Sequence, residues 1–210
     1  MKNIMIFGDS YSTFDYCVPK GYAVYYHIKP RPETDVTRVE ETWWHGLCEE
    51  KSLNLVRNDS WSGSTVGYTG WNGADTSKTS SFIYRLEKLT EEGFFEKNKI
   101  DTVLIFGTTN DSWCNAPLGE IKLEGIERDD LFSVCPAICY FVGKVKSALP
   151  EADILFMINT GLKEEVCDAI RAACEHFGAR FLELQDIDKR CGHPTIAGMK
   201  SIKEQVAAVL

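Results

Sequence analysis

The chain has 210 residues, with 23 Lys and Arg against 31 Asp and Glu, so its formal net charge is −8. The length suits one well-packed domain, and 44% hydrophobic with 26% charged residues exclude a disordered chain or a fibre. The acidic balance argues against a nucleic-acid-binding protein, which needs a basic face, and it identifies no other partner.

Five short apolar segments are predicted to form buried strands, at residues 3–7, 53–57, 102–106, 153–158 and 179–184. Segments with helical spacing separate them, at 42–51, 81–92 and 130–149, where Pro150 should end the helix. Thr160 can cap a further helix that runs to about residue 177 and stops at Gly178. The last helix is expected to begin after Pro194 and to run to Leu210.

Strands and helices thus alternate along the whole chain. This alternation predicts βαβ units, and therefore a parallel sheet with helices on both faces. We expect residues 1–210 to form a single three-layer α/β/α domain with a flavodoxin-like, five-stranded parallel sheet. In such sheets the chemistry collects in the loops at the carboxyl ends of the strands.

Two long irregular stretches, residues 11–39 and 58–80, exceed what this scaffold needs. Loops of this length are usually functional, and their aromatic content argues against disorder, so we expect them to build a pocket wall. Four aromatic residues fall in the predicted rim loops, namely Trp61, Tyr68, Trp71 and Trp113. Their rings could stack on sugar faces, line an acyl pocket, or form a small core beneath the loops.

The sequence favours a reduced, cytoplasmic protein. Its first apolar run is far shorter than that of a signal peptide, and no apolar stretch approaches the roughly 20 residues that span a bilayer. The eight cysteines include no C-x-x-C pair, and Cys167 and Cys174 are interpreted as small core residues of a helix. We therefore expect no metal, no cofactor and no membrane contact, while the oligomeric state is not indicated.

Polar clusters follow four of the five predicted strands. They occupy residues 8–12, 58–65, 107–111 and 191–194. Because the carboxyl ends of parallel strands meet at one edge of a sheet, all four clusters are expected on one rim.

This rim supplies the groups needed for acyl transfer. Ser10 is a candidate nucleophile, and His193 is the base that would take its proton. Gly63 can present a bare backbone N–H and Asn110 a side-chain N–H to a developing oxyanion. Taken singly, each has a plainer explanation, since Ser10 could cap a helix and Gly63 could simply form a turn.

Gly8-Asp9-Ser10, Gly63, Asn110 and His193-Pro194, in this order and on these loops, resemble the motif blocks of the GDSL/SGNH hydrolase superfamily. The resemblance covers nearly the whole chain. By contrast, the Gly-x-Ser-x-Gly elbow of α/β-hydrolases is absent, because Ser12 stands where its final Gly would be.

Two positions depart from the family pattern. Thr108 stands two residues before Asn110, where members usually have Gly, although Gly107 could restore the turn with a one-residue adjustment. Arg190 stands three residues before His193, where members usually have Asp. Either Asp188 reaches His193 from a longer loop, or a backbone carbonyl orients the imidazole and the enzyme is a Ser-His dyad.

The resemblance implies a serine ester hydrolase that acts on a small-molecule ester through a Ser10 acyl-enzyme. Such enzymes remove acetyl or other short acyl groups, often from carbohydrates, and the family also includes lipases and thioesterases. We favour an acetylated carbohydrate, because the long loops mix aromatic residues with Ser, Thr and Asn rather than forming an apolar channel.

Two other functions stay open at this point. The scaffold could bind a phosphorylated or nucleotide ligand, although no Gly-x-Gly-x-x-Gly or Walker pattern is present. It could also be a degenerate member of the family that binds glycan without hydrolysis, since the usual Asp is missing.

Overall fold

The computed structural model describes all 210 residues. It contains a five-stranded parallel sheet in the order β2-β1-β3-β4-β5 and a separate two-stranded antiparallel hairpin. The strands of the sheet are β1 (Asn3–Gly8), β2 (Asn54–Ser60), β3 (Thr102–Phe106), β4 (Asp153–Ile158) and β5 (Arg180–Glu183). The hairpin consists of β6 (Lys189–Arg190) and β7 (His193–Pro194).

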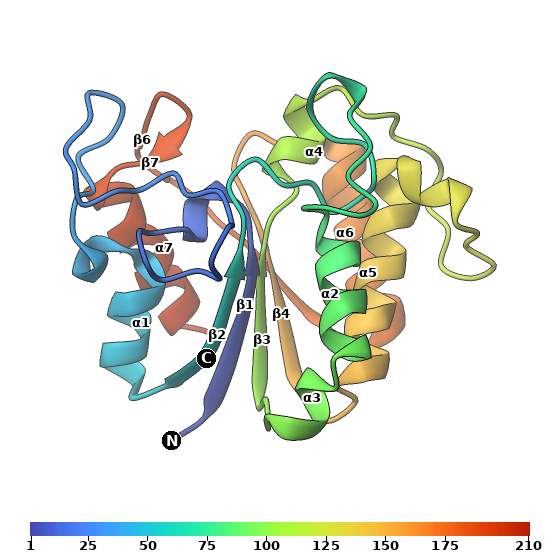
Figure 1. The fold of residues 1–210 in the computed structure, drawn as a ribbon, viewed down its shortest axis with the longest axis horizontal. Helices are drawn as coiled ribbons and strands as arrows, with labels where there is room; N and C mark the ends of the chain where they lie inside the picture. Colours follow the sequence, from blue (N-terminus) through green and yellow to red (C-terminus); the bar gives the residue numbers. More distant parts are fainter.

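Helices cover both faces of this sheet (Figure 1). They are α1 (Trp43–Lys51), α2 (Phe82–Glu91), α3 (Phe94–Lys97), α4 (Thr109–Trp113), α5 (Val134–Ala148), α6 (Glu164–Phe177) and α7 (Ile196–Ala207). The helices α1 and α7 lie on one face, and α2, α5 and α6 lie on the other. The predicted three-layer α/β/α domain with a flavodoxin-like parallel sheet is confirmed. No helix has the length and apolar composition that a membrane crossing requires.

The central strands explain the continuous apolar segments of the sequence. In β1, Ile4 and Ile6 pack on the α1–α7 side, whereas Met5 and Phe7 pack on the α2–α5–α6 side. Successive side chains of a strand point to opposite faces, so a strand covered by helices on both faces must be apolar at every position.

The elements differ from the predicted ones mainly at helix starts. The expected Thr160 cap is wrong, because α6 begins at Glu164 after Lys163, whose N–H donates to the Ser112 hydroxyl at 2.9 Å. The expected stop at Gly178 is confirmed, with a left-handed φ of +67°. A 3-10 turn over Asp129–Phe132 precedes α5, which starts later than predicted.

Candidate active site

The carboxyl ends of β1 and β3 lie side by side where the strand order reverses. The chain passes from β1 to β2 on one side and then returns to β3 on the other side of β1. Open α/β sheets bind ligands at such a reversal point. Ser10 follows β1 and Asn110 lies at the start of the helix after β3, so the topology brings both predicted residues to it.

Ser10 opens a 3-10 turn, Ser10–Ser12, directly after β1. Asp9 caps this turn, since its carboxylate accepts a hydrogen bond from the Tyr11 N–H at 3.1 Å. The Asp9 N–H donates in turn to the Phe106 carbonyl of β3 at 3.2 Å. A Cβ at Gly8 would overlap the Ser60 hydroxyl, so the chain can approach β2 closely only with glycine there. The backbone around Ser10 is therefore fixed from both neighbouring strands.

His193 lies against Ser10, with Nε2 at 2.9 Å from the Ser10 Oγ. Its Nδ1 is 3.1 Å from the carbonyl oxygen of Cys191. A carbonyl only accepts hydrogen bonds, so Nδ1 carries the proton and Nε2 is left to accept the proton of the serine hydroxyl. This is the arrangement that a serine nucleophile requires.

The environment of His193 keeps its imidazole neutral. Burial lowers the pKa of His193 from the ordinary 6.5, and the nearby charges of Arg31 and Lys189 lower it further. The hydrogen bond to the Cys191 carbonyl acts in the opposite direction. A neutral imidazole at pH 7 can serve as a general base.

The β6–β7 hairpin positions this imidazole. It turns through Cys191 and Gly192, whose φ values are +48° and +76°. The Tyr11 hydroxyl donates to the Gly192 carbonyl at 2.5 Å, and the Tyr26 hydroxyl donates to the Pro194 carbonyl at 2.9 Å. Two tyrosines from the loop after β1 therefore anchor the hairpin on either side of His193.

Asp188 is not joined to His193 in this structure. Its carboxylate accepts a hydrogen bond from the Thr195 hydroxyl, and its carbonyl accepts one from the Thr195 N–H at 3.1 Å. Thr195 is the N-cap of α7. Arg190 is paired with His193 across the hairpin and supplies no carboxylate. The hydrogen-bond partners of the imidazole are Ser10 and the Cys191 carbonyl.

Gly63 lies in a turn over residues 61–64 with a φ of +81°. The Trp61 N–H donates to the Gly8 carbonyl at 3.0 Å, which attaches this turn to the end of β1. The Gly63 N–H donates to no acceptor within the protein, and open space surrounds the position of a Cβ at this residue. This N–H is available to an outside oxygen atom.

Asn110 is buried in the first turn of α4. Its Nδ2 donates to the Ser64 carbonyl at 2.9 Å, and its Oδ1 accepts from the Trp71 indole N–H at 3.2 Å. Because an amide nitrogen carries two hydrogens, one N–H of Asn110 is left for a further acceptor.

Thr108 itself adopts the left-handed conformation before α4, with a φ of +69°. The expected one-residue adjustment to Gly107 is therefore wrong. Gly107 serves a different purpose, since a Cβ there would overlap the Phe82 ring. A β-branched residue at positive φ is strained, which explains why Gly suits this position.

The buried side chain of Arg85 forms hydrogen bonds that connect the loops of the site. It is fully buried on α2, and its guanidinium donates to the Asp59 carboxylate at 2.8 Å, the Gly8 carbonyl at 3.4 Å and the Ser64 hydroxyl at 3.3 Å. These contacts connect the strand that precedes Ser10 with the turn that contains Gly63. Arg85 was not predicted from the sequence, although a charged residue on the apolar stripe of α2 was a usable signal.

Two carboxyl groups are buried beside these loops. The Asp111 carboxylate accepts from the N–H groups of Val66 and Gly67 at 2.9 and 3.3 Å. Burial raises the pKa of Asp9 to about 7 and the pKa of Asp111 to about 6. The negative charge of Asp111 adds to the rise at Asp9.

The rim aromatics differ in burial. Tyr68 is fully buried and belongs to the core, and Trp61 packs on Tyr22 with a centroid distance of 4.3 Å and ring planes inclined by 35°. Trp71 and Trp113 are 44% and 39% exposed. The Trp71 indole N–H donates to Asn110, and the Trp113 ring lies against Gly192. Both exposed indoles therefore border the predicted site.

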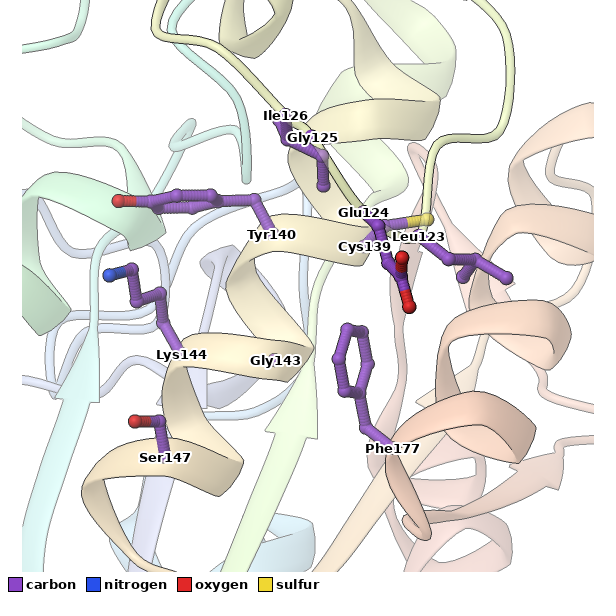
Figure 2. A pocket seen from close by; sticks show the side chains of 10 residues that line it. All are labelled: Leu123, Glu124, Gly125, Ile126, Cys139, Tyr140, Gly143, Lys144, Ser147 and Phe177. Carbon is purple, nitrogen blue, oxygen red and sulfur yellow. The ribbon is translucent and has the colours of Figure 1, made fainter.

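A separate surface cavity of about 290 Å³ lies between α5, α6 and the loop at residues 123–126, as Figure 2 shows. Tyr140 and Lys144 project from one side of α5, and the Phe177 ring of α6 lies beside Gly143. None of the predicted site residues lines it. No group of three or more His, Cys, Asp or Glu side chains in the molecule is arranged to hold a metal ion.

Comparisons with known proteins fit this geometry. The family model described as GDSL-like lipase/acylhydrolase matches residues 2–210. A protein from Bacteroides ovatus, provisionally described as a GDSL-like lipase, is 42% identical with a TM-score of 0.91, over 100% of this chain and 97% of that chain. A protein of the same description from Bacteroides uniformis has the same identity and TM-score, over 100% and 95%. The search of curated proteins gave no match.

A more distant structure shares the fold. An acetyl xylan esterase from the rumen bacterium Butyrivibrio proteoclasticus is 16% identical with a TM-score of 0.64. The match covers 100% of this chain and 63% of that protein.

Proposed function

Because the chain belongs to the GDSL-like lipase/acylhydrolase family and is a carboxylic ester hydrolase, we propose that Ser10 is its nucleophile and that its substrates are acetyl esters of carbohydrates. The observation that carries the catalytic assignment is the 2.9 Å contact between the Ser10 Oγ and a neutral His193 Nε2. A loop that only binds phosphate does not require a serine hydroxyl paired with a neutral imidazole.

In the proposed reaction, the Ser10 Oγ attacks the ester carbonyl carbon while His193 Nε2 takes the hydroxyl proton. The carbonyl oxygen becomes an oxyanion, to which the N–H groups of Ser10 and Gly63 and the free Asn110 N–H donate. The tetrahedral intermediate collapses, and the imidazolium gives its proton to the departing alcohol. Water then attacks the acyl-enzyme, with His193 again acting as base, and the acid leaves.

We propose a Ser-His dyad rather than a triad. The Cys191 carbonyl holds Nδ1–H, and Asp188 is occupied at the N-cap of α7. A carbonyl fixes the tautomer but carries no full charge, so it stabilises the imidazolium less than a carboxylate would.

The carbohydrate assignment is supported by the two open indoles beside the site. Trp71 and Trp113 are exposed on a rim that also carries Ser, Thr and Asn side chains, and indole faces suit the apolar faces of sugar rings. The fold shared with an acetyl xylan esterase agrees with this substrate class. The lipase and thioesterase alternative predicts instead an extended apolar channel, and a long-chain preference.

The test is hydrolysis of p-nitrophenyl acetate, butyrate and octanoate, and of acetylated xylo-oligosaccharides, by the wild type, Ser10→Ala and His193→Ala. We expect the wild type to prefer acetate and both variants to lose about 10³-fold or more in kcat. Fluorophosphonate should label the wild type and leave Ser10→Ala unlabelled. An active Ser10→Ala would refute the catalytic assignment, and a preference for octanoate would refute the substrate class.

Trp113 tests the sugar contact separately. Trp113→Leu should raise KM about tenfold for acetylated xylo-oligosaccharides and less than threefold for p-nitrophenyl acetate, because only the first substrate has sugar rings to stack. An equal effect on both substrates would remove the support that Trp113 gives to a carbohydrate substrate.

A further inference from the structure

Tyr25 contacts His193 more closely than any other ring in the site. The phenol and imidazole rings are stacked, with centroids 3.5 Å apart and planes inclined by 5°. Tyr11 and Tyr26 also neighbour His193, but at 5.4 and 6.4 Å and at steep angles. Tyr25 therefore covers one face of the imidazole.

The position of Tyr25 is tied to the nucleophile. The Tyr25 N–H donates to the Thr13 hydroxyl at 2.9 Å, and this hydroxyl donates to the Ser10 carbonyl at 3.0 Å. These two hydrogen bonds thus fix the Tyr25 backbone relative to Ser10.

Arg31 secures Tyr25 from the other end of the loop. Its guanidinium donates a hydrogen bond to the Tyr25 carbonyl and lies over the Tyr25 ring at 4.9 Å. A guanidinium over an aromatic face is attracted to it, which favours this orientation of the Tyr25 ring. The stacked position is therefore imposed from two sides, by Thr13 and by Arg31.

The proposed reaction creates a positive charge on His193, directly beside the Tyr25 ring. When Ser10 loses its proton, His193 becomes an imidazolium without a carboxylate beside it, and Arg31 and Lys189 both oppose its charge. The face of a tyrosine ring is electron-rich and attracts a cation, most strongly where water is excluded.

Granting the proposed function, we propose that Tyr25 is a positioning residue for the reaction, which holds the His193 ring toward Ser10 and stabilises the imidazolium where related sites use a carboxylate. Tyr25→Leu removes the aromatic face but keeps the imidazole covered. It should lower kcat for p-nitrophenyl acetate about 5- to 30-fold with KM within threefold, whereas Tyr25→Phe should stay within threefold of the wild type. Tyr25→Met repeats the removal with an unbranched side chain, should Tyr25→Leu fold poorly.

A second readout needs no turnover. NMR titration of the four histidines, with His193 assigned through His193→Gln, should show a lower pKa of His193 in Tyr25→Leu than in the wild type or Tyr25→Phe. Tyr16→Leu is a matched control, because Tyr16 lies in the same loop but is 93% exposed. It should change neither kcat nor the titration.

The outcomes separate the two proposals. If Ser10→Ala is as active as the wild type, the proposed function fails, whatever Tyr25 does. If Ser10→Ala is inactive while Tyr25→Leu and Tyr25→Met match the wild type in kcat and in the titration of His193, the role of Tyr25 is overturned and the proposed function stands.

Discussion

The carboxylate of Asp188 accepts a hydrogen bond from the Thr195 hydroxyl, and an asparagine can accept the same bond. We therefore expect Asp188→Asn to keep kcat/KM within about threefold of the wild type, and to cost less than about 1 kcal/mol of stability at the start of α7. Steady-state hydrolysis of p-nitrophenyl acetate measures the first value, and urea unfolding the second. A loss near 10⁴-fold, as for removal of a triad Asp, would show that Asp188 reaches His193 during turnover.

In the proposed mechanism, His193 sets the pH dependence of activity. Only the neutral imidazole can take the Ser10 proton, and burial lowers its pKa from the ordinary 6.5. We expect kcat/KM to be low in acid and to rise through one limb whose midpoint lies below 6.5. A rate profile with a non-ionising ester measures this midpoint, and a value above 7 would contradict the neutral environment described for His193.

Thr108 carries backbone strain that glycine would relieve. Thr108→Gly and Thr108→Ala lose the same buried contacts to within one methyl group, but only glycine adopts a φ of +69° freely. We expect Thr108→Gly to be about 1 kcal/mol more stable than Thr108→Ala in urea unfolding. Equal stabilities would mean that the positive φ costs nothing here.

Among the secondary-structure elements, the β6–β7 hairpin depends most on the backbone conformation of its turn, Cys191-Gly192. Both turn residues have positive φ, and Asn-Gly is the sequence best suited to such a turn. Cys191→Asn should keep the carbonyl that binds His193, with kcat within about twofold and stability raised by a few tenths of a kcal/mol. Gly192→Ala should lose about 1 kcal/mol and about tenfold in kcat, because its Cβ would lie 3.0 Å from the Trp113 ring at an unfavourable φ.

Thermal unfolding and steady-state kinetics on the two variants decide this prediction. If Gly192→Ala matches Cys191→Asn in both, the turn does not control the position of His193.

The sequence predicted the elements that hydrophobic periodicity defines. All five strands of the sheet and the long helices were found, because runs of apolar residues or an apolar stripe leave a pattern in the sequence. The predicted burial of the fifth strand is wrong, because β5 lies at the edge of the sheet and exposes Arg180, Phe181 and Glu183. The helix α4 and the hairpin were not found, since a five-residue helix and a pair of two-residue strands are too short for any period. These short elements carry Asn110 and His193, which is why the site had to be located by the order of strand ends.

The sequence does not predict which hydrogen-bond or stacking partner each loop side chain takes. The rule that polar residues collect at carboxyl ends of parallel strands needs only the order of elements, and it brought Ser10 and His193 together correctly in space. Whether Asp188 binds His193 or Thr195, and which tyrosine stacks on the imidazole, depends on side-chain directions that a linear sequence does not encode locally.

At the scale of the whole molecule, the buried carboxyl of Asp9 links stability to pH. Its pKa is about 7 when folded and near 3.8 when unfolded, so between these values the folded protein holds a proton that the unfolded chain has released. Stability should therefore fall as pH rises from about 4 to 7, by at most about 1.4 kcal/mol per pH unit from this one group.

Asp9→Asn mimics the protonated form and should flatten this decline, leaving the smaller contribution of Asp111, whose pKa is about 6. Urea unfolding of both proteins at several pH values tests this. Parallel stability curves for the wild type and Asp9→Asn would show that Asp9 does not bind a proton on folding.

The 183 positions that separate Ser10 from His193 along the chain also order events during translation. Ser10 leaves the ribosome with β1, whereas His193, its proposed base, follows only with the β6–β7 hairpin. A nascent chain that has not yet reached His193 therefore carries the Ser10 hydroxyl without the imidazole that we propose as its activating base. A fragment that stops before Lys189 should accordingly fail to react with fluorophosphonate, so esterase chemistry is withheld until the hairpin that carries His193 has been synthesised.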